Sequence, residues 1–220
     1  MATISPTGQR GRAIGLIALM VLVWCAPAQA SETTAGYELT IRNTNPGQNF
    51  SPPVIVLHTP GFRLFEIGQP ATTALWRLAE DGSTAEFQAL ADPEVRAVVV
   101  GRPVHRRDTP VVTTAFESAP DLLISVAAML SLTNDGFVAA RSIALPDDVG
   151  ASTTVALHAY DAGSEANTES SAHLPCEIHD QRMTEGVVTD HAGIRGDADI
   201  AISRGWNGPD LGALTITRLR

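Results

Sequence analysis

The sequence predicts an all-β protein, an antiparallel β-sandwich with one or two short helices inserted. Three observations predict it: short stretches of alternating apolar and polar residues recur, helical spacing is confined to one region, and strands and helices do not alternate as in α/β proteins. The 220 residues are 44% hydrophobic and 18% charged. A chain of this length and composition can bury a real core as one domain.

The first predicted elements are two strands. Residues 37–44 alternate, with Tyr37 and Leu39 on one face and polar side chains on the other, which is typical of a half-buried strand. Residues 53–59 are a short apolar run whose leading proline suits the start or edge of a strand. A short extended piece is expected at 62–65.

Helical spacing follows between residues 72 and 91. Leu75, Leu78 and Ala79 recur at the spacing of one helix face, and Gly82 interrupts the pattern. The run Ser-Thr-Ala-Glu directly after the glycine has the form of a capping box. Two short helices are therefore predicted in this region.

Strands account for most of the remaining chain. The strongest alternation lies at 122–133, while 163–181 is polar and irregular and is expected to form a long loop. The last strand is expected to be paired inside a sheet. In chain order, the strands predicted after the helices are residues 95–100, 111–116, 122–133, 137–145, 153–160, 187–191 and 213–219.

The N-terminus predicts export. Two arginines precede an uncharged apolar run at 13–26, and an Ala-Gln-Ala tripeptide that ends at Ala30 has small residues at both cleavage-determining positions. Residues 1–30 are therefore predicted to be a secretory signal peptide and 31–220 a single domain. No transmembrane span is expected after cleavage, so the protein is expected to be secreted or periplasmic.

The charge excludes one class of partner, and the motifs give no support to catalysis. The formal net charge is -9, and all 15 cations are arginines against 24 acids. Sequence-independent nucleic-acid binding needs a basic face, so nucleic acid is not an expected partner. Neither a nucleophile elbow of the form G-x-S-x-G nor a helical H-E-x-x-H occurs, so the protein is not expected to be an enzyme.

Strand directions place three acids at one end of the predicted sandwich. If 122–133 runs upward and the next strand runs down, then 153–160 runs upward again, so Asp135 and Asp161 lie at the same end. Glu165 follows Asp161 across a flexible Ala-Gly-Ser turn and can fold back to the same point. The neighbouring acidic pair at 147 and 148 falls at the opposite end.

Two explanations fit these acids. Carboxylates that converge on loops are what Ca²⁺ requires, with carbonyl oxygens and water completing its shell. Asn, Asp and Gly also dominate ordinary turns for backbone reasons, and on spacing alone this simpler explanation is favoured.

Two sequence runs resemble the spondin N-terminal domain family, the F-spondin and mindin type of domain. They are L-T-N-D-G-F-V-A at 132–139 and A-Y-D-A-G-S-E at 159–165. The run F-E-I-G-Q-P-A at 65–71 is similar to the exported bacterial branch in particular. The resemblance covers the chain from about Tyr37 to the C-terminus.

The resemblance implies a β-sandwich similar to synaptotagmin-type calcium domains, with Ca²⁺ held at one rim. Asp135 corresponds to the family's ligand after the long core strand, and Asp161 and Glu165 correspond to its D-A-G-x-D pair. Glu165 stands where animal members have Asp, and Gly136 where they have an aromatic residue. With the resemblance added, a calcium site is favoured. The expected function is an extracellular or envelope binding or adhesion module for a protein or glycan at the cell surface.

One alternative of another class is a copper-binding electron carrier similar to cupredoxins. Cys176, His179 and Met183 have the spacing C-x-x-H-x-x-x-M, and thiolate, imidazole and thioether are ligands that copper prefers. His58 is a candidate fourth ligand. The thiol follows a polar loop rather than ending an apolar strand, which disfavours this alternative.

Overall fold

The computed structural model describes residues 1–3, 34–117, 121–174 and 184–220. The chain divides into two units, Met1–Ser31 and Glu32–Arg220. Of the first unit only residues 1–3 are described, and the second contains every described helix and strand. No helix in the described ranges has the length and apolar character needed to cross a membrane.

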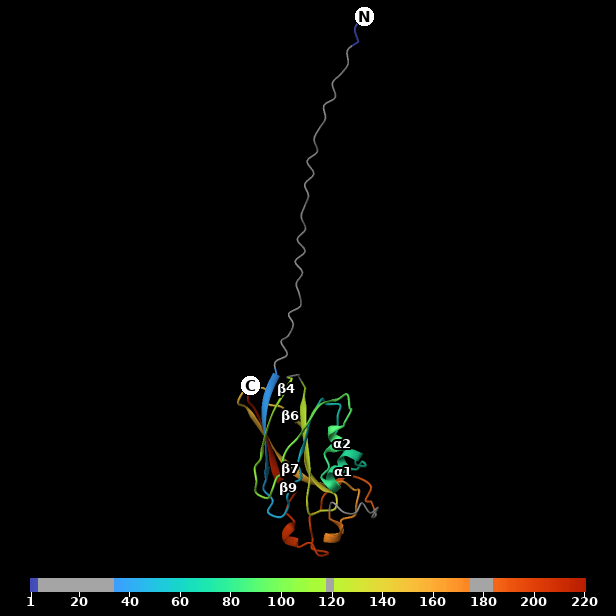
Figure 1. The fold of residues 1–220 in the computed structure, drawn as a ribbon, viewed down its shortest axis with the longest axis vertical. Helices are drawn as coiled ribbons and strands as arrows, with labels where there is room; N and C mark the ends of the chain where they lie inside the picture. The colour runs from blue at the N-terminus through green and yellow to red at the C-terminus, as the bar shows by residue number, and fades with distance from the viewer. Residues whose placement is uncertain (4–33, 118–120, 175–183) are drawn as a thin grey trace. The chain divides into compact units, whose positions relative to one another are not determined.

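Within the described residues, nine strands form one antiparallel sheet (Figure 1). The strands are β1 (Thr34–Asn43), β2 (Val54–His58), β3 (Val95–Val100), β4 (Val111–Glu117), β5 (Leu123–Met129), β6 (Gly136–Ala144), β7 (Ser152–Asp161), β8 (Thr189–Asp190) and β9 (Asp210–Arg218). Their order is β3-β2-β5-β6-β7-β9-β1-β4, and β8 pairs with β7. The predicted all-β architecture is confirmed, and so is the pairing of the last strand inside the sheet, between β7 and β1.

The inner face of the sheet holds the main hydrophobic core. Leu39 of β1 and Ile55 of β2 belong to one buried cluster with Ile124 of β5 and Ile216 of β9, although β1 and β2 lie near opposite ends of the strand order. The sheet must therefore curl over so that its two halves face each other across this core. The alternation seen in the sequence places these apolar side chains inward, because successive residues of a strand point to opposite faces.

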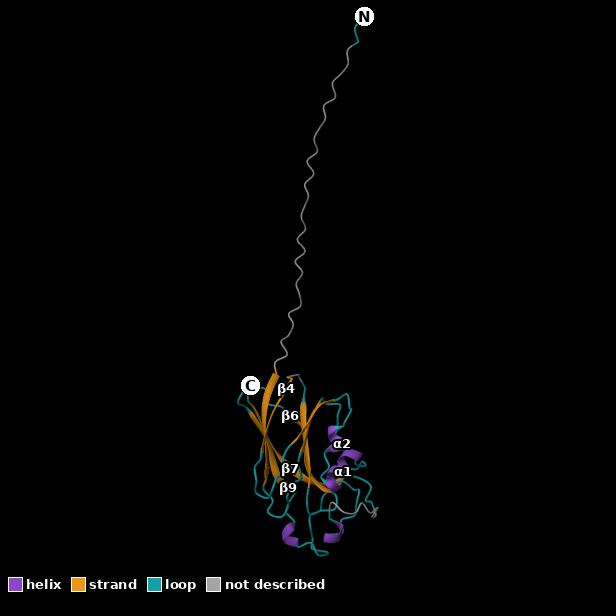
Figure 2. Ribbon diagram, in the orientation of Figure 1, coloured by secondary structure: helices purple, strands orange, loops and turns teal. Residues whose placement is uncertain are grey.

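A second layer covers the outer face of β2, β5 and β6. It consists of α1 (Thr73–Asp81), α2 (Ala85–Gln88) and the chain that precedes them, and both helices lie on the same side of the strands (Figure 2). The side chain of Thr72 caps α1 by accepting from the backbone N–H of Leu75 at 3.3 Å. Gly82 ends the helix at a φ of 68°, which glycine adopts without steric cost. The two predicted helices are confirmed.

Three expectations about strands need correction. The predicted strand 122–133 ends at Met129, because the chain soon enters the turn that leads to β6. The extended piece expected at 62–65 joins no strand, and its apolar side chains are buried while Arg63 is exposed. Only Thr189–Asp190 of the predicted strand 187–191 pairs with β7, because the backbone of Val188 bonds instead to the loop at Gly68 and Gln69.

Candidate metal centre

Two of the three predicted acids lie next to each other at one end of the sheet. Gly136, the first residue of β6, pairs with Asp161, the last of β7. The backbone N–H of Ala162 donates to the carbonyl oxygen of Asp135 at 3.1 Å. The side chain of Thr133 shapes the turn before β6, since its hydroxyl accepts from the N–H of Gly136 at 3.0 Å. The strand directions read from the sequence therefore place Asp135 and Asp161 correctly at one rim.

Asp135 is fully buried and only half of its carboxylate is satisfied. Its Oδ2 accepts from the backbone N–H of Ser164 at 2.7 Å, from that of Glu165 at 2.9 Å, and from the Ser164 hydroxyl at 3.2 Å. Its Oδ1 is buried and has no hydrogen-bond partner among the described residues. An unsatisfied buried oxygen of this kind is costly and calls for an explanation.

Asp161 is 1% exposed and organises the turn that follows it. Its Oδ1 accepts from the backbone N–H of Gly163 at 2.7 Å, and its Oδ2 accepts from the side-chain amide of Asn167. Gly163 has a φ of 68°, and a Cβ at this position would overlap the main chain of Val187. The turn therefore needs glycine, both for its backbone conformation and for the close approach of residue 187.

Burial makes both aspartates costly to ionise, and the charge of Asp161 adds to that cost at Asp135. Burial and, after it, the negative charge of Asp161 raise the pKa of Asp135 to about 7, against the opposing effect of the hydrogen bonds from Ser164 and Glu165. Burial likewise raises the pKa of Asp161, against the bonds from Gly163 and Asn167. Neighbouring buried carboxylates resist being charged together unless a cation lies between or beside them.

Glu165 is placed at the rim, but its carboxylate does not complete a cluster. Its side chain is largely buried at 6% exposure, and its backbone N–H contacts Asp135. Among the described residues, no three Asp, Glu, His or Cys side chains stand together in an arrangement suited to a metal ion. The structure thus joins Asp135 with Asp161 and brings Glu165 to them through its main chain.

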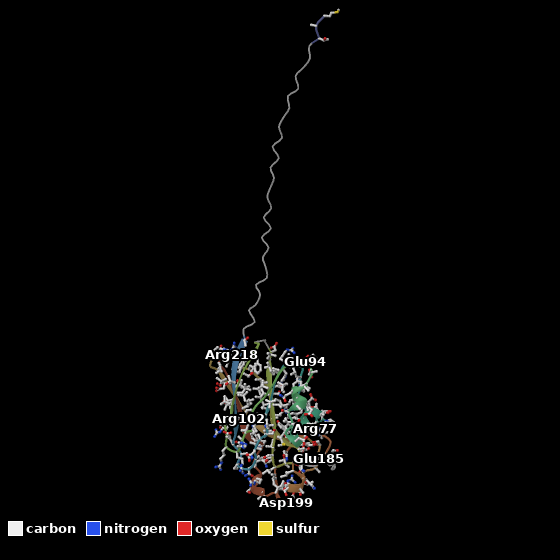
Figure 3. All side chains as sticks on the ribbon, viewed as in Figure 1. Arg77, Glu94, Arg102, Glu185, Asp199 and Arg218 are labelled. Carbon is white, nitrogen blue, oxygen red and sulfur yellow. The ribbon has the colours of Figure 1, made fainter. Side chains whose placement is uncertain are left out.

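Two further oxygen-bearing residues at this rim were not predicted. Asn167 binds Asp161, and Glu185 has its pKa raised, mainly by burial and then by the charge of Asp161. Figure 3 shows Glu185 toward the end that also carries Asp199, opposite Arg218 at the far end of β9. Asn167 lies two residues past Glu165, so proximity in sequence could have indicated it. Glu185 is far from Asp161 in the sequence, so only the tertiary fold could reveal that it lies near this rim.

Carboxylates also tie the rim loops to one another. Glu169 accepts from three consecutive backbone N–H groups, those of residues 195–197, at 2.6 to 2.7 Å. The carboxylate of Asp199 accepts from the backbone N–H of Ser171 at 2.7 Å. Asn134 joins the turn before β6 to the same loop through Thr168 and His173. The aspartate pair therefore sits in a connected set of loops.

The residues at this rim fit a hard cation in their chemistry. All the side chains named at the centre offer oxygen, which Ca²⁺ prefers. Asp135 has an unpartnered Oδ1 among the described residues, and its carboxylate is close enough to Asp161 to be affected by the charge of that residue. A cation would also stabilise the charged forms of both aspartates, whose pKa values are raised by burial and, at Asp135, also by the charge of Asp161.

The predicted copper ligands cannot be compared in the same way. Cys176, His179 and Met183 lie outside the described residues. His58 is buried, and both of its ring nitrogens are engaged, Nδ1 with the carbonyl of Thr59 at 2.7 Å and Nε2 with the hydroxyl of Ser125 at 2.8 Å. In this arrangement His58 has no nitrogen free for a metal.

Comparison with known proteins identifies one family. The family described as Spondin_N matches the chain over residues 40–190. The matched range runs from within β1 to the end of β8 and contains both helices and all three predicted acids. No curated protein matches the chain.

Proposed function

From the premise that the chain belongs to the Spondin_N family, we propose that it is an exported calcium-binding domain that serves as a binding or adhesion module. In this proposal Asp135, Asp161 and Glu165 hold Ca²⁺, and the protein performs no catalysis. The N-terminal segment 1–30 acts as the secretory signal, and the domain works as a secreted or periplasmic protein.

One observation carries the calcium proposal: the Oδ1 atom of Asp135 is buried, has no partner among the described residues, and belongs to a carboxylate next to Asp161. A bound cation would accept this oxygen as a ligand and remove the unfavourable interaction between the two aspartates. Glu165 is itself one of the backbone donors to Asp135, and in this proposal its carboxylate oxygens join the ligands. Asn167 and Glu185 are additional oxygen donors in reach of the same region.

The position of the site supports a binding role. The aspartate pair lies among loops joined by hydrogen bonds in which Asn134 donates and Glu169 and Asp199 accept. Ordering one loop would therefore order its neighbours, and loops carried on a rigid sheet are a common place for partner recognition. We propose an extracellular or cell-surface protein or glycan as that partner.

Thermal unfolding tests the calcium site directly. After chelation, addition of Ca²⁺ in excess of its dissociation constant is expected to raise the Tm by several degrees, because a ligand that binds only the folded state stabilises it by mass action. The variant Asp161→Ala is expected to lose this shift. Mg²⁺ at the same concentration is expected to have a smaller effect, since it demands stricter geometry.

The matched control is Asp147→Ala, at the other end of the sheet. Asp147 is an exposed acid in the turn between β6 and β7, so its loss changes the net charge equally and should leave the calcium shift intact. A native protein whose Tm does not respond to Ca²⁺ would contradict the proposed site.

A further inference from the structure

A hollow lined by two arginines lies between the loop that follows β2 and the outer face of β6. Its volume is about 370 Å³, and Arg63 and Arg141 both line it. It shares no residue with the proposed calcium site. Because the protein has 24 acids and only 15 arginines, two arginines that converge on one hollow and form no ion pair with any described residue need an explanation.

Arg141 is held in a fixed orientation. Its guanidinium carbon lies 4.4 Å from the ring centroid of Phe65 and 5.6 Å from that of Tyr160. These rings are themselves packed against each other at 4.8 Å and against Phe137. Such stacking suits the planar guanidinium and restricts its motion. One nitrogen, Nη1, donates to the carbonyl of Phe65 at 3.4 Å.

Arg63 is exposed and is held by hydrogen bonds to main-chain carbonyls. Its Nη1 donates to the carbonyls of Pro60 and Phe62. For both Arg63 and Arg141, the Nε and Nη2 donors have no acceptor among the described residues, and neither side chain forms an ion pair there. That edge of a guanidinium is a pair of parallel donors, which matches the two oxygens of a carboxylate, sulfate or phosphate.

The backbone at the hollow is strained. Ser142, the neighbour of Arg141 and a residue of the hollow's lining, has a φ of 52°, a conformation that costs a non-glycine residue about 1 kcal/mol or more. Its backbone N–H donates to the hydroxyl of Ser125 at 2.9 Å, and that hydroxyl contacts the buried ring of His58. A buried polar pair thus maintains a strained residue at the mouth of the hollow, and such strain is concentrated at functional sites.

We propose that this hollow binds an oxyanion group of an organic ligand through Arg63 and Arg141. Glu66 also lines the hollow but forms no ion pair with either arginine among the described residues, so the two positive charges exceed the one negative charge. Ile67, which is 51% exposed, lies in the same lining and provides an apolar contact for the carbon skeleton of the ligand. The shared chemistry of the ligand is a carboxylate, sulfate or phosphate group.

Nuclear magnetic resonance of the arginine Nε–H groups tests the proposal in the intact protein. Inorganic phosphate, sulfate and acetate are titrated separately at constant ionic strength against chloride. We expect saturable shifts of the Arg63 and Arg141 signals with at least one of these anions, and the preferred anion distinguishes a tetrahedral from a planar ligand group. Shifts that never saturate with any of the three would overturn the proposal.

Variants separate specific binding from general attraction to positive charge. Arg63→Lys and Arg141→Lys keep the charge but lose the paired donors, so each is expected to weaken binding about tenfold. Arg96 is the matched control, because it is also exposed and also donates to a main-chain carbonyl, that of Pro93, but does not line the hollow. Equal weakening by Arg96→Lys would contradict the assignment. Arg63 is exposed, so its variant tests the proposal without disturbing the fold.

Discussion

Asp135 is a buried carboxyl group whose ionisation its surroundings disfavour. Burial and the neighbouring Asp161 raise its pKa to about 7, so without a cation the folded protein resists its ionisation. An acid whose folded pKa is raised contributes stability at low pH that is lost as the pH rises through that pKa. His191 has its pKa lowered to about 4 by burial, which gives the opposite dependence, so the two effects must be separated by mutation.

The variant Asp135→Asn isolates the aspartate. In the absence of Ca²⁺ we expect the variant to be more stable than the native protein at pH 8, because the amide carries no charge, and the difference should shrink toward zero below about pH 4. Added Ca²⁺ should stabilise the native protein at pH 8 and leave the variant unchanged. The measurement is urea unfolding at a series of pH values, with and without Ca²⁺. A variant that is less stable than the native protein at pH 8 under chelation would contradict the assigned repulsion.

Gly163 is the second residue for which the structure makes a sharp prediction. Gly163→Ala should lower the free energy of unfolding by about 2 kcal/mol or more, because the turn has a positive φ and the added Cβ meets the main chain of Val187. Gly150→Ala is the control: it also has a positive φ, but its Cβ would meet no atom within 4 Å. The control variant should lower the free energy of unfolding by only about 1 kcal/mol, which is the cost of the backbone strain. Equal losses for both variants in urea unfolding would show that the close approach to Val187 is unimportant.

Among the elements, the long loops are held by side chains rather than by strand pairing. The 191–209 connection contains only the short 3-10 helix Ile202–Arg204 and is fastened by Glu169, whose pKa is lowered by the hydrogen bonds from residues 195–197, although burial alone would raise it. Glu169 itself has a φ of 51°. The loop that carries Asp161 and Glu165 therefore shares an anchor with the 191–209 connection.

Glu169→Gln should loosen this anchor. A glutamine amide is neutral and accepts through one oxygen only, so all three N–H groups of residues 195–197 lose a charged acceptor and at least one of them loses its acceptor, at a cost of roughly 1–3 kcal/mol to the local structure. Hydrogen exchange at residues 195–197 should become faster by tenfold or more, while exchange in β9 stays unchanged. Glu86→Gln, which removes a charge from a helix outside the rim, is the control. Unaltered exchange at 195–197 would show that the loop is held by other contacts.

In the folded domain as a whole, the two hydrophobic clusters share strands. Alternate residues of β5 and β6 point into the inner core and into the layer under α1 and α2: Val138 belongs to the first cluster and Phe137 to the second. If either cluster lost its packing, one face of the strands that it shares with the other cluster would be exposed to water. The domain should therefore unfold as one cooperative unit.

Two substitutions test this cooperativity. Leu214→Ala in β9 and Phe87→Ala in α2 each empty a fully buried position and should cost about 2–5 kcal/mol. In both variants, circular dichroism and tryptophan fluorescence should report one coincident transition at a lower urea concentration. Ile202→Ala, at a residue that is 68% exposed, should leave the midpoint nearly unchanged. Separate transitions for the two probes in Phe87→Ala would show that the helical layer unfolds independently.

The sequence was sufficient to predict the strands, the two helices and the end of the sheet at which Asp135 and Asp161 meet. Alternation with period two is a local property that follows from the backbone geometry of a strand, and counting strand reversals fixes which turns share an end. The prediction failed for the short strand at 187–191, because the backbone of Val188 bonds to the loop at Gly68 and not to a strand. No local sequence pattern marks that contact.

Tertiary structure decided everything that depends on contacts between distant parts of the chain. The partnership of His58 with Ser125 spans 67 residues and that of Glu169 with Gly196 spans 27. The same holds for the unpartnered oxygen of Asp135 and for the placement of Arg63 and Arg141 at one hollow. Burial, and with it the pKa of a carboxylate, is set by the curl of the whole sheet, because neighbours in sequence do not determine which side chains exclude water from a group.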